Sequence, residues 1–264
     1  MLRFRASNIH LYTPAEVEKV RRAAQAAAQV RDRVAEAIQP GMTTLDVDNL
    51  AGVFIRETGG VSGSLGYHGF PRQICVSVND EVVHGIGRAE RCIAPGDLVK
   101  VDVVVNIDGF FGDTARTVCA GFPEPVGLPG ELMRVTREAL AAGIERAHEG
   151  NCINDIGAAV ERVAEAAGFS CVRDMIGHGC GRKMHEAPDV PNYRQSGKTP
   201  RLAAGMIICI EPMINVGTWR ITVDAEDHWT VRSADHSLSA HFEHQILITN
   251  KEPIILTYGQ NGLH

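Results

Sequence analysis

Two acidic residues lie where the sequence otherwise predicts buried β-strands. Asp102 interrupts the apolar run LVKVDVVV, and Glu211 interrupts the run MIICIEPMI. An ionised carboxylate without a partner is strongly unfavourable in an apolar interior, so each needs a cation or must stay protonated. Two more acids, Asp113 in GFFGDTART and Glu243 in AHFEHQILIT, occupy other strand-like segments. We therefore expect four carboxylates to converge around bound metal.

One histidine completes this candidate metal site. His178 lies in GHGCGRKMHE, where the neighbouring glycines allow a close approach of the backbone. Two divalent ions would balance the charge of four ionised carboxylates if the imidazole is neutral. Oxygen-rich ligation with one imidazole favours Mn²⁺, Fe²⁺ or Co²⁺ over structural zinc, which prefers thiolates. Two ions roughly 3.5–4 Å apart can share a water, lower its pKa toward about 7 and polarise a carbonyl, which is the chemistry of hydrolysis.

Each residue taken alone also has a structural explanation. Asp113 could bond backbone amides at a hairpin, Glu243 could be an exposed strand residue, and His178 could be an ordinary buried histidine. Asp102 and Glu211 are harder to explain in this way, because both interrupt apolar runs. The combination of the five residues, rather than any one of them, indicates a metal site.

An internal repeat suggests how the acids come together. Segments 95–106 and 204–215 align without gaps at an offset of 109, which matches Asp102 with Glu211. The same offset aligns 41–60 with 150–169, and a shift of 110 places YHG (67–69) over GHG (177–179). We infer two related halves, at roughly 13–123 and 128–250, that would meet at a pseudo-twofold axis. The alternative is two unrelated α+β segments with coincidental glycines.

Helices and strands must position these groups. Thr13 to Glu16 form a capping box with Pro at the first helical position, and Pro40-Gly41 ends that helix. Further helices are predicted at about 44–58, 129–148 and 154–167. Runs rich in Val and Ile between turn residues predict strands near 73–79, 97–107, 110–119, 205–216, 219–224, 228–232 and 241–249. A tight hairpin at 106–109 would bring Asp102 and Asp113 to neighbouring positions, and the polar, Pro-rich segment 185–204 predicts a loop.

Composition and charge exclude several classes of protein. The 264 residues are 44% hydrophobic and 22% charged, as in ordinary globular proteins. A net charge of −6 argues against nucleic-acid binding, which depends on neutralising phosphates. No apolar run approaches the roughly 20 residues of a membrane helix, and the first residues lack the apolar region of a signal peptide. Seven cysteines without C-x-x-C spacing indicate reduced thiols and a cytoplasmic protein.

Several blocks of the sequence closely resemble type I methionine aminopeptidases: YHGFPRQICVSVNDEVVHGI, VKVDVVVNIDGFFGDTART, GHGCGRKMHEAPDVPNY, MIICIEPMI and SLSAHFEHQILIT. The resemblance implies an α+β, pita-bread (creatinase/aminopeptidase) fold. In this fold, residues 1–264 form a single catalytic domain whose pseudo-twofold halves build a curved antiparallel sheet covered by helices. The family's ligands to two divalent ions (Co²⁺, Mn²⁺, Fe²⁺ or similar) fall on the five residues selected above: Asp102, Asp113, His178, Glu211 and Glu243.

The resemblance also implies an activity. A metalloaminopeptidase would remove the N-terminal methionine from nascent proteins and peptides with a small second residue, by attack of a metal-bridging hydroxide on the first peptide bond. Glu211 would serve as ligand and proton acceptor, His84 would contact the scissile amide, and His185 would hydrogen-bond the substrate carbonyl. Asn79 and Ser239 match positions that hold a monovalent cation in relatives. The methionine pocket would be formed by Tyr67, Phe70, Cys75, Met184 and Trp229.

Two pocket positions depart from the family pattern, which often has Tyr where this chain has Phe70 and Phe where it has Met184. The size of the pocket and its inhibitor profile therefore stay open. We expect a monomer that binds a peptide or nascent-chain N-terminus, contacts the ribosome only transiently, and has no membrane or nucleic-acid partner. The alternatives are an aminopeptidase P or prolidase, which usually carries a separate N-terminal domain, and a non-catalytic peptide-binding relative, which would have lost metal ligands.

Overall fold

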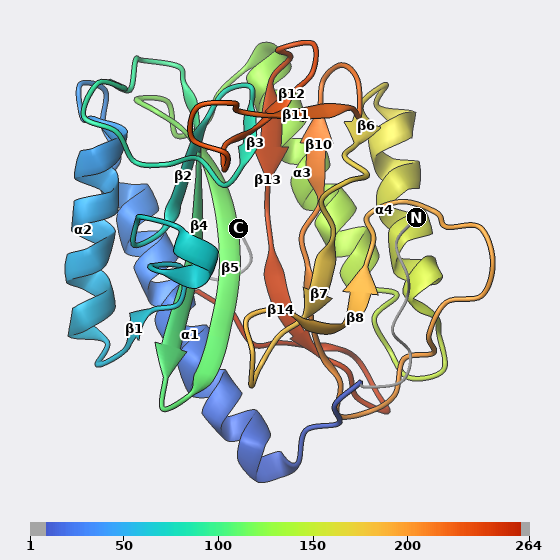
Figure 1. The fold of residues 1–264 in the computed structure, drawn as a ribbon. Helices are drawn as coiled ribbons and strands as arrows, with labels where there is room; N and C mark the ends of the chain where they lie inside the picture. The colour runs from blue at the N-terminus through green and yellow to red at the C-terminus, as the bar shows by residue number, and fades with distance from the viewer. Residues whose placement is uncertain (1–8, 260–264) are drawn as a thin grey trace.

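The computed structural model describes residues 9–259, and these form two halves that face each other across a central seam (Figure 1). In the first half, helices α1 (Pro14–Ala37) and α2 (Thr44–Glu57) cover a four-stranded antiparallel sheet, with α1 packed along the long central hairpin. The strands of this sheet are β1 (Val61–Ser62), β2 (Cys75–Val78), β4 (Leu98–Ile107) and β5 (Phe110–Cys119).

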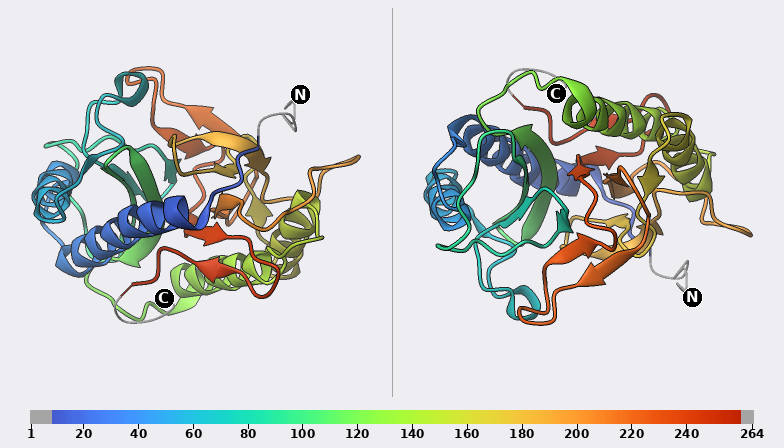
Figure 2. Two further views of the ribbon diagram at one scale, coloured as in Figure 1. Left: turned by 90° about the horizontal axis from the view of Figure 1, so that it is seen from below. Right: turned by 90° about the horizontal axis from the view of Figure 1, so that it is seen from above.

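The second half repeats the plan with shorter strands. Helices α3 (Gly127–Ile144) and α4 (Ile153–Ala166) lie on its outer side (Figure 2). Its strands form a five-stranded sheet in the order β15-β14-β9-β7-β8 and a three-stranded sheet in the order β13-β10-β6. These strands are β6 (Ser170–Cys171), β7 (Gly177–Gly179), β8 (Glu186–Val190), β9 (Ile207–Ile210), β10 (Met213–Asn215), β13 (Ser239–His241), β14 (His244–Leu247) and β15 (Ile254–Ile255).

A small sheet and the chain segment from β13 to β14 connect the two halves. This sheet consists of β11 (Ile221–Val223), β12 (Val231–Ser233) and β3 (Glu81–Val83) in that order, so β3 of the first half pairs with β12 of the second. The segment from β13 to β14 runs beside β5, where the N–H of Glu243 donates to the carbonyl of Ala115 at 3.0 Å. A 3₁₀ turn, η2 (Tyr67–Gly69), lies between β1 and β2 in the first half.

The repeat at an offset of 109 is visible in the backbone. Gly96 and Gly205 precede equivalent strands and adopt φ values of 90° and 92°, a left-handed conformation that favours glycine. Two isolated antiparallel bridges also coincide at this offset: Thr43 with Cys92, and Cys152 with Arg201.

One block of the predicted repeat is wrong. Tyr67–Gly69 form the turn η2, whereas Gly177–Gly179 form strand β7. In the first half β4 pairs with β1, β2 and β5, and η2 takes part in none of these pairings, whereas in the second half β7 pairs with β8 and β9. A three-residue match containing two glycines carried too little information to define this register.

The predictions made from local sequence are most accurate at helix N-caps and hairpin turns. The Thr13–Glu16 capping box and Pro14 at the helix start are confirmed. Asp108 and Gly109 form the two-residue hairpin turn with φ values of 52° and 81°. The third helix, predicted over 129–148, runs instead from Gly127 to Ile144, and the chain then tightens into turns.

Two strand predictions and one loop prediction need correction. The segment 205–216 is two strands broken at Glu211-Pro212, since proline has no N–H for the ladder. The segment 241–249 is broken at 242–243, between β13 and β14. The segment 185–204 is not all loop, because β8 pairs with β7 at the edge of the sheet. An edge strand tolerates polar residues and proline, so its composition conceals it.

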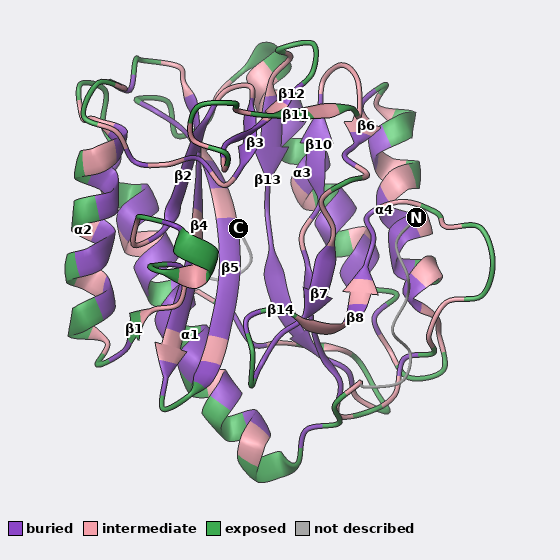
Figure 3. Ribbon diagram, viewed as in Figure 1, coloured by how far each residue is buried: buried purple, intermediate pink, exposed green. Residues whose placement is uncertain are grey.

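Each half has its own apolar core between helices and sheet (Figure 3). The first core contains Val30, Ile55 and Val101, and the second contains Leu132, Ile156 and Ile208. Across residues 9–259, no helix is both long and apolar enough to span a membrane. The packing of each core holds its strands against its helices and so determines where the two sheets meet at the seam.

Candidate active site

A cavity of ≈ 400 Å³ opens at the seam between the halves, and all the residues predicted for metal binding, catalysis and substrate binding line it. Both halves contribute to its walls. The predicted ligands lining the cavity are Asp102, Asp113, His178, Glu211 and Glu243. The other predicted residues are His84, His185, Tyr67, Phe70, Cys75, Met184 and Trp229.

The two carboxylates of the first half project from the β4–β5 hairpin. Asp102 lies opposite Ala115, and Asp113 lies opposite Val104, so the acids are diagonal neighbours on one face rather than directly opposed. Burial raises the pKa of Asp102 to about 7. Burial, followed by repulsion from Glu243 and Asp102, raises the pKa of Asp113 well above its usual value.

The two carboxylates of the second half stand at breaks between strands. Glu211 directly follows β9, and Glu243 lies between β13 and β14. The Glu243 carbonyl accepts a hydrogen bond from the Thr114 hydroxyl at 2.8 Å, which fixes this backbone beside Asp113. Burial and the other carboxylates of the cluster raise the pKa of both Glu211 and Glu243 well above the usual range.

His178 presents one ring nitrogen to these acids. Its Nδ1 lies 3.0 Å from the carbonyl of Gly179, so Nδ1–H can donate there and leave the lone pair on Nε2. Nε2 is 3.3 Å from a carboxylate oxygen of Glu211 and 3.8 Å from one of Asp113. Burial lowers the pKa of His178 to about 3, which keeps the imidazole neutral. A neutral imidazole fixed by a backbone carbonyl is the usual form of a metal-binding histidine.

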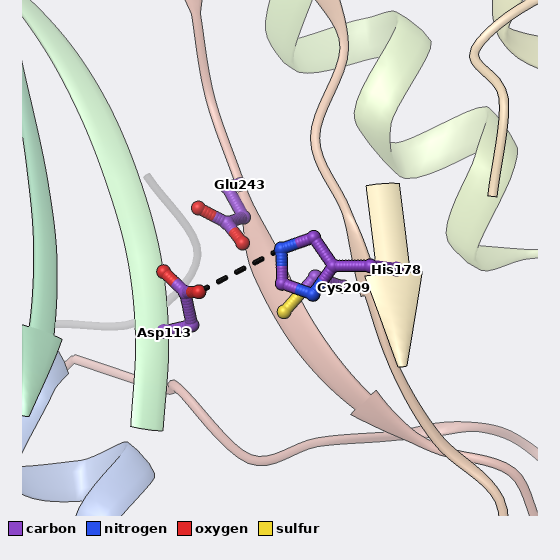
Figure 4. Close-up of side chains that lie close together, drawn as sticks. All are labelled: Asp113, His178, Cys209 and Glu243. Carbon is purple, nitrogen blue, oxygen red and sulfur yellow. Dashed lines mark ion pairs between the residues drawn. The ribbon is translucent and has the colours of Figure 1, made fainter. Parts of the chain in front are cut away.

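Figure 4 shows how closely three of these ligands approach one another. Ligand atoms of Asp113, His178, Glu243 and the unpredicted Cys209 all lie within 4.8 Å of each other. Burial raises the pKa of the Cys209 thiol well above its usual value. A neutral thiol is a poor ligand, so Cys209 is better described as part of the wall behind the carboxylates.

The donor set fits divalent metal ions. Glu243 Oε1 is buried and has no hydrogen-bond partner among the described residues. Four carboxylates and one neutral imidazole are hard donors of the kind that Mn²⁺, Fe²⁺ and Co²⁺ accept. Positive charge placed between these groups would relieve the mutual repulsion that raises their pKa values.

The apolar part of the cavity lies beside this cluster. The rings of Phe70 and Trp229 meet edge to face with centroids 5.2 Å apart, and Met184 is buried. The ring of His185 lies 4.2 Å from that of His178, and its Nδ1 is 2.8 Å from the hydroxyl of Tyr67. These contacts connect an aromatic pocket directly to the carboxylate cluster.

The second predicted catalytic histidine, His84, follows β3 with a φ of 58° and lies beside Trp229, with ring centroids 6.3 Å apart. Burial lowers the pKa of His84 to about 4, and burial also lowers the pKa of His185. Both rings are therefore neutral near pH 7, and a neutral ring can donate one hydrogen bond and accept another.

Two buried residues near the ligands had not been predicted. Arg31 of α1 donates from Nη1 to the Thr114 hydroxyl at 2.7 Å, so it supports the bond from Thr114 to the Glu243 carbonyl. His241 Nε2 lies 3.8 Å from Glu211, and neither ring nitrogen has a hydrogen-bond partner among the described residues. Arg31 interrupts an apolar helix face in the sequence, which is a signal that could have identified it.

The position expected to hold a monovalent cation contains a side chain of the protein. The carbonyls of Asn79 and Ser239 both accept hydrogen bonds from Nζ of Lys100. This replaces the expectation of a free cation, because the lysine amine occupies the space between the two carbonyls. Lys100 stands two residues before Asp102, and its place inside an apolar run was the missed signal.

Comparisons with known proteins agree with this geometry. Residues 18–250 match the model of metallopeptidase family M24. The chain is 45% identical over 252 residues to methionine aminopeptidase A of Synechocystis sp., covering 96% of this chain and 98% of the relative. The solved methionine aminopeptidase of Rickettsia prowazekii superposes with a TM-score of 0.90 at 38% identity, covering 95% of this chain and 100% of that one.

A more distant likeness bears on the fold alone. The prolidase of Pyrococcus furiosus gives a TM-score of 0.75 at 20% identity, covering 95% of this chain and 66% of that one. This neighbour also spans nearly the whole chain, so it supports the predicted pita-bread class, but its identity is low. The family match and the relatives of high identity span nearly the whole chain as well. The chain belongs to metallopeptidase family M24, among its methionine aminopeptidases.

Proposed function

We propose that this enzyme hydrolyses the first peptide bond of peptides and nascent proteins that begin with methionine and have a small second residue. The observation that supports this proposal is that one cavity contains both a carboxylate cluster and an apolar pocket. Buried carboxylates and Nε2 of His178 form one part, and a pocket containing Phe70, Met184 and Trp229 forms the other. The first can hold a hydrolytic metal centre, and the second can hold an apolar side chain.

The metal ligands in this proposal are Asp102, Asp113, His178, Glu211 and Glu243, holding two divalent ions. From the family resemblance, we assign Asp113 and Glu243 as the ligands that both ions would share. When bound, the ions would supply Lewis acidity and lower the pKa of a shared water. The protein's part is to hold the carboxylates against their own repulsion and to keep His178 neutral.

Three side chains handle the substrate and its protons. We assign Glu211 as the proton acceptor during attack, because its carboxylate lines the cavity and lies 3.3 Å from Nε2 of His178. We assign the Tyr67 hydroxyl as donor to Nδ1 of His185, which places the ring proton on Nε2, where it can stabilise the developing oxyanion. His84, on the opposite half, orients the scissile amide and its leaving amine.

The pocket explains a preference for methionine. A thioether is flexible and polarisable, and it gains modest contact energy against aromatic edges. Phe70 and Trp229 present such an edge-to-face pair, while Cys75 and Met184 add buried apolar sulfur groups. Tyr67 closes the side of the pocket next to His185. The pair Phe70 and Met184 sets the width of the pocket in this chain.

The two halves act as a single catalytic domain in this proposal, because neither half alone supplies the ligand set. We further propose a monomer working in the cytoplasm on free N-termini, with transient contact with the ribosome. All seven cysteines are unpaired thiols, as is typical of a reducing compartment.

The test is release of free methionine from Met-Ala-Ser by purified enzyme loaded separately with Mn²⁺, Fe²⁺ or Co²⁺. Turnover is expected with at least one of these metals, together with loss of activity after chelation and its return when metal is restored. Xaa-Pro peptides serve as the matched control for a prolidase or aminopeptidase P activity. Persistent turnover by metal-free enzyme would contradict the two-metal scheme, and metal binding without any turnover would indicate a peptide-binding protein instead.

A further inference from the structure

A lysine side chain is buried at the seam between the two halves. Lys100 is 1% exposed and lies on β4 two residues before Asp102, so both side chains project from the same face of the strand. Its Nζ donates to the carbonyl oxygen of Asn79 at 2.7 Å and to that of Ser239 at 3.1 Å. Lysine is almost never fully buried unless it is paired, so this position indicates a specific role.

The two carbonyls belong to segments that lead into the candidate site. Asn79 lies in the turn between β2 and β3, which continues to His84. Ser239 begins β13, which ends shortly before Glu243. The N–H of Ser239 also donates to the Asn79 carbonyl at 3.1 Å. Lys100 therefore stands where β4 of the first half meets β13 of the second, two residues from Asp102.

The surroundings of the amine attract positive charge. The negative charges of Glu81, Asp80 and Asp97 favour the charged form of the Lys100 amine. Two carbonyl dipoles directed at one point add to this negative potential. Such a position suits a cation, whether the cation is free or carried on a side chain.

We propose that Lys100 is a positioning residue whose tethered amine does the structural work of a bound monovalent cation. By holding the carbonyls of Asn79 and Ser239 together, it sets the spacing between the strand that bears Asp102, the turn that leads to His84 and the segment that leads to Glu243. The proposal rests on the peptidase function above, because the groups it positions are those of the candidate site. It predicts an enzyme that works without added monovalent cations.

The first experiment measures thermal unfolding of the metal-free protein and needs no turnover. Wild type, Lys100→Met and the exposed control Lys251→Met are melted in tetramethylammonium chloride, then in equal concentrations of KCl or NH₄Cl. Lys100→Met should melt several degrees below wild type in tetramethylammonium, which is too large for the vacated space. K⁺ or NH₄⁺ should restore much of that loss, while wild type and Lys251→Met should be insensitive to the choice of cation.

The second experiment repeats the comparison with metal-loaded enzyme and Met-Ala-Ser. Loss of a group that supports metal ligands typically costs roughly ten- to a hundred-fold in activity, and we expect a loss of that size for Lys100→Met in tetramethylammonium. K⁺ or NH₄⁺ should recover activity in the same order in which they recover the melting temperature. Lys100→Gln, which keeps one donor, is tested in parallel in case the methionine variant does not fold.

Two outcomes would overturn the proposal. One is a wild-type enzyme that itself requires K⁺, since the amine would then not replace a cation. The other is a folded Lys100 variant whose stability and activity respond to no cation, because Lys100 would then act only through packing. If wild type shows no peptidase activity at all, the proposed function fails, and the melting experiment still decides the role of Lys100.

Discussion

In the first half of the molecule, Asp102 and Asp113 belong to one unbroken hairpin, whereas in the second half Glu211 and Glu243 stand at breaks between short strands. The strands are related by the repeat, and Gly96 and Gly205 turn the chain in the same way before them. The difference therefore arises after the shared turn, at the carboxylates themselves.

This difference indicates that the two halves hold their metal-ligand candidates in different ways. The register of β4 and β5 fixes the short aspartates, so the first half provides a rigid platform. The longer glutamates reach toward that platform from backbone that is pinned by separate contacts, such as the bond from the Glu243 N–H to Ala115. A ligand placed at a strand break can also change its position slightly, which suits Glu211 if it handles a proton as well as metal.

The largest effect is expected when the two equivalent acids, Asp102 of the first half and Glu211 of the second, are neutralised one at a time. Glu211→Gln should lower kcat on Met-Ala-Ser by roughly 10²–10⁴-fold, because it removes a proton acceptor as well as a ligand. Added Mn²⁺ should not restore this loss. Asp102→Asn should show a smaller loss that higher Mn²⁺ partly restores, since its role is ligation alone.

Circular dichroism and bound-metal analysis accompany these measurements, so that misfolding is not mistaken for loss of chemistry. Near-wild-type turnover by folded Glu211→Gln would remove Glu211 from its assigned role. Equal losses in both variants, equally restored by metal, would mean that the two halves contribute in the same way.

A smaller difference between the halves is expected for the two histidines assigned to the substrate, His185 and His84. His185→Ala should reduce kcat by roughly a hundred-fold with little change in KM, because a bond to the oxyanion strengthens in the transition state. His84→Ala, from the other half, should raise KM more than it lowers kcat, since His84 orients the bound amide. Steady-state kinetics on one peptide series separates the two effects, and a pure KM effect in His185→Ala would contradict its role.

The sequence predicted the parts of the fold that depend on local chemistry. The capping box at Thr13 and the hairpin at Asp108-Gly109 follow from hydrogen bonding and backbone preference within a few residues. Acids inside apolar runs were informative for a related reason. Burial of a charge is so unfavourable that Asp102 and Glu211 had to face a common polar site, and both line the same cavity.

The failures concern features that depend on distant partners. The edge strand β8 was missed because its pairing with β7 outweighs its polar composition. Lys100 was missed because its acceptors are main-chain carbonyls, one of them 139 residues away, and carbonyls leave no mark on the sequence. Arg31 likewise finds its partner, Thr114, 83 residues along the chain.

The smallest expected effect tests the repeat itself, at the first turns of α2 and α4. Thr43 and Cys152 occupy equivalent N-cap positions, and their N–H groups donate to Asp46 at 2.8 Å and Asp155 at 2.7 Å. Only the first half pairs this with a good side-chain acceptor: the Thr43 hydroxyl accepts from the Asp46 N–H at 3.1 Å, whereas a thiol is a weak acceptor.

Substitutions at these two N-cap positions should therefore change the free energy of unfolding in opposite directions while leaving turnover unchanged. Thr43→Ala should lower the free energy of unfolding by about 1 kcal/mol, and Cys152→Thr should raise it by less than about 1 kcal/mol. For a chain of this size, 1 kcal/mol corresponds to a shift in melting temperature of roughly 2–4 °C, which calorimetry resolves. If Cys152→Thr instead destabilised the protein, a hydroxyl at this N-cap would not stabilise α4 as it stabilises α2. The repeat would then extend to the backbone geometry of the two helix starts but not to the interactions that stabilise them.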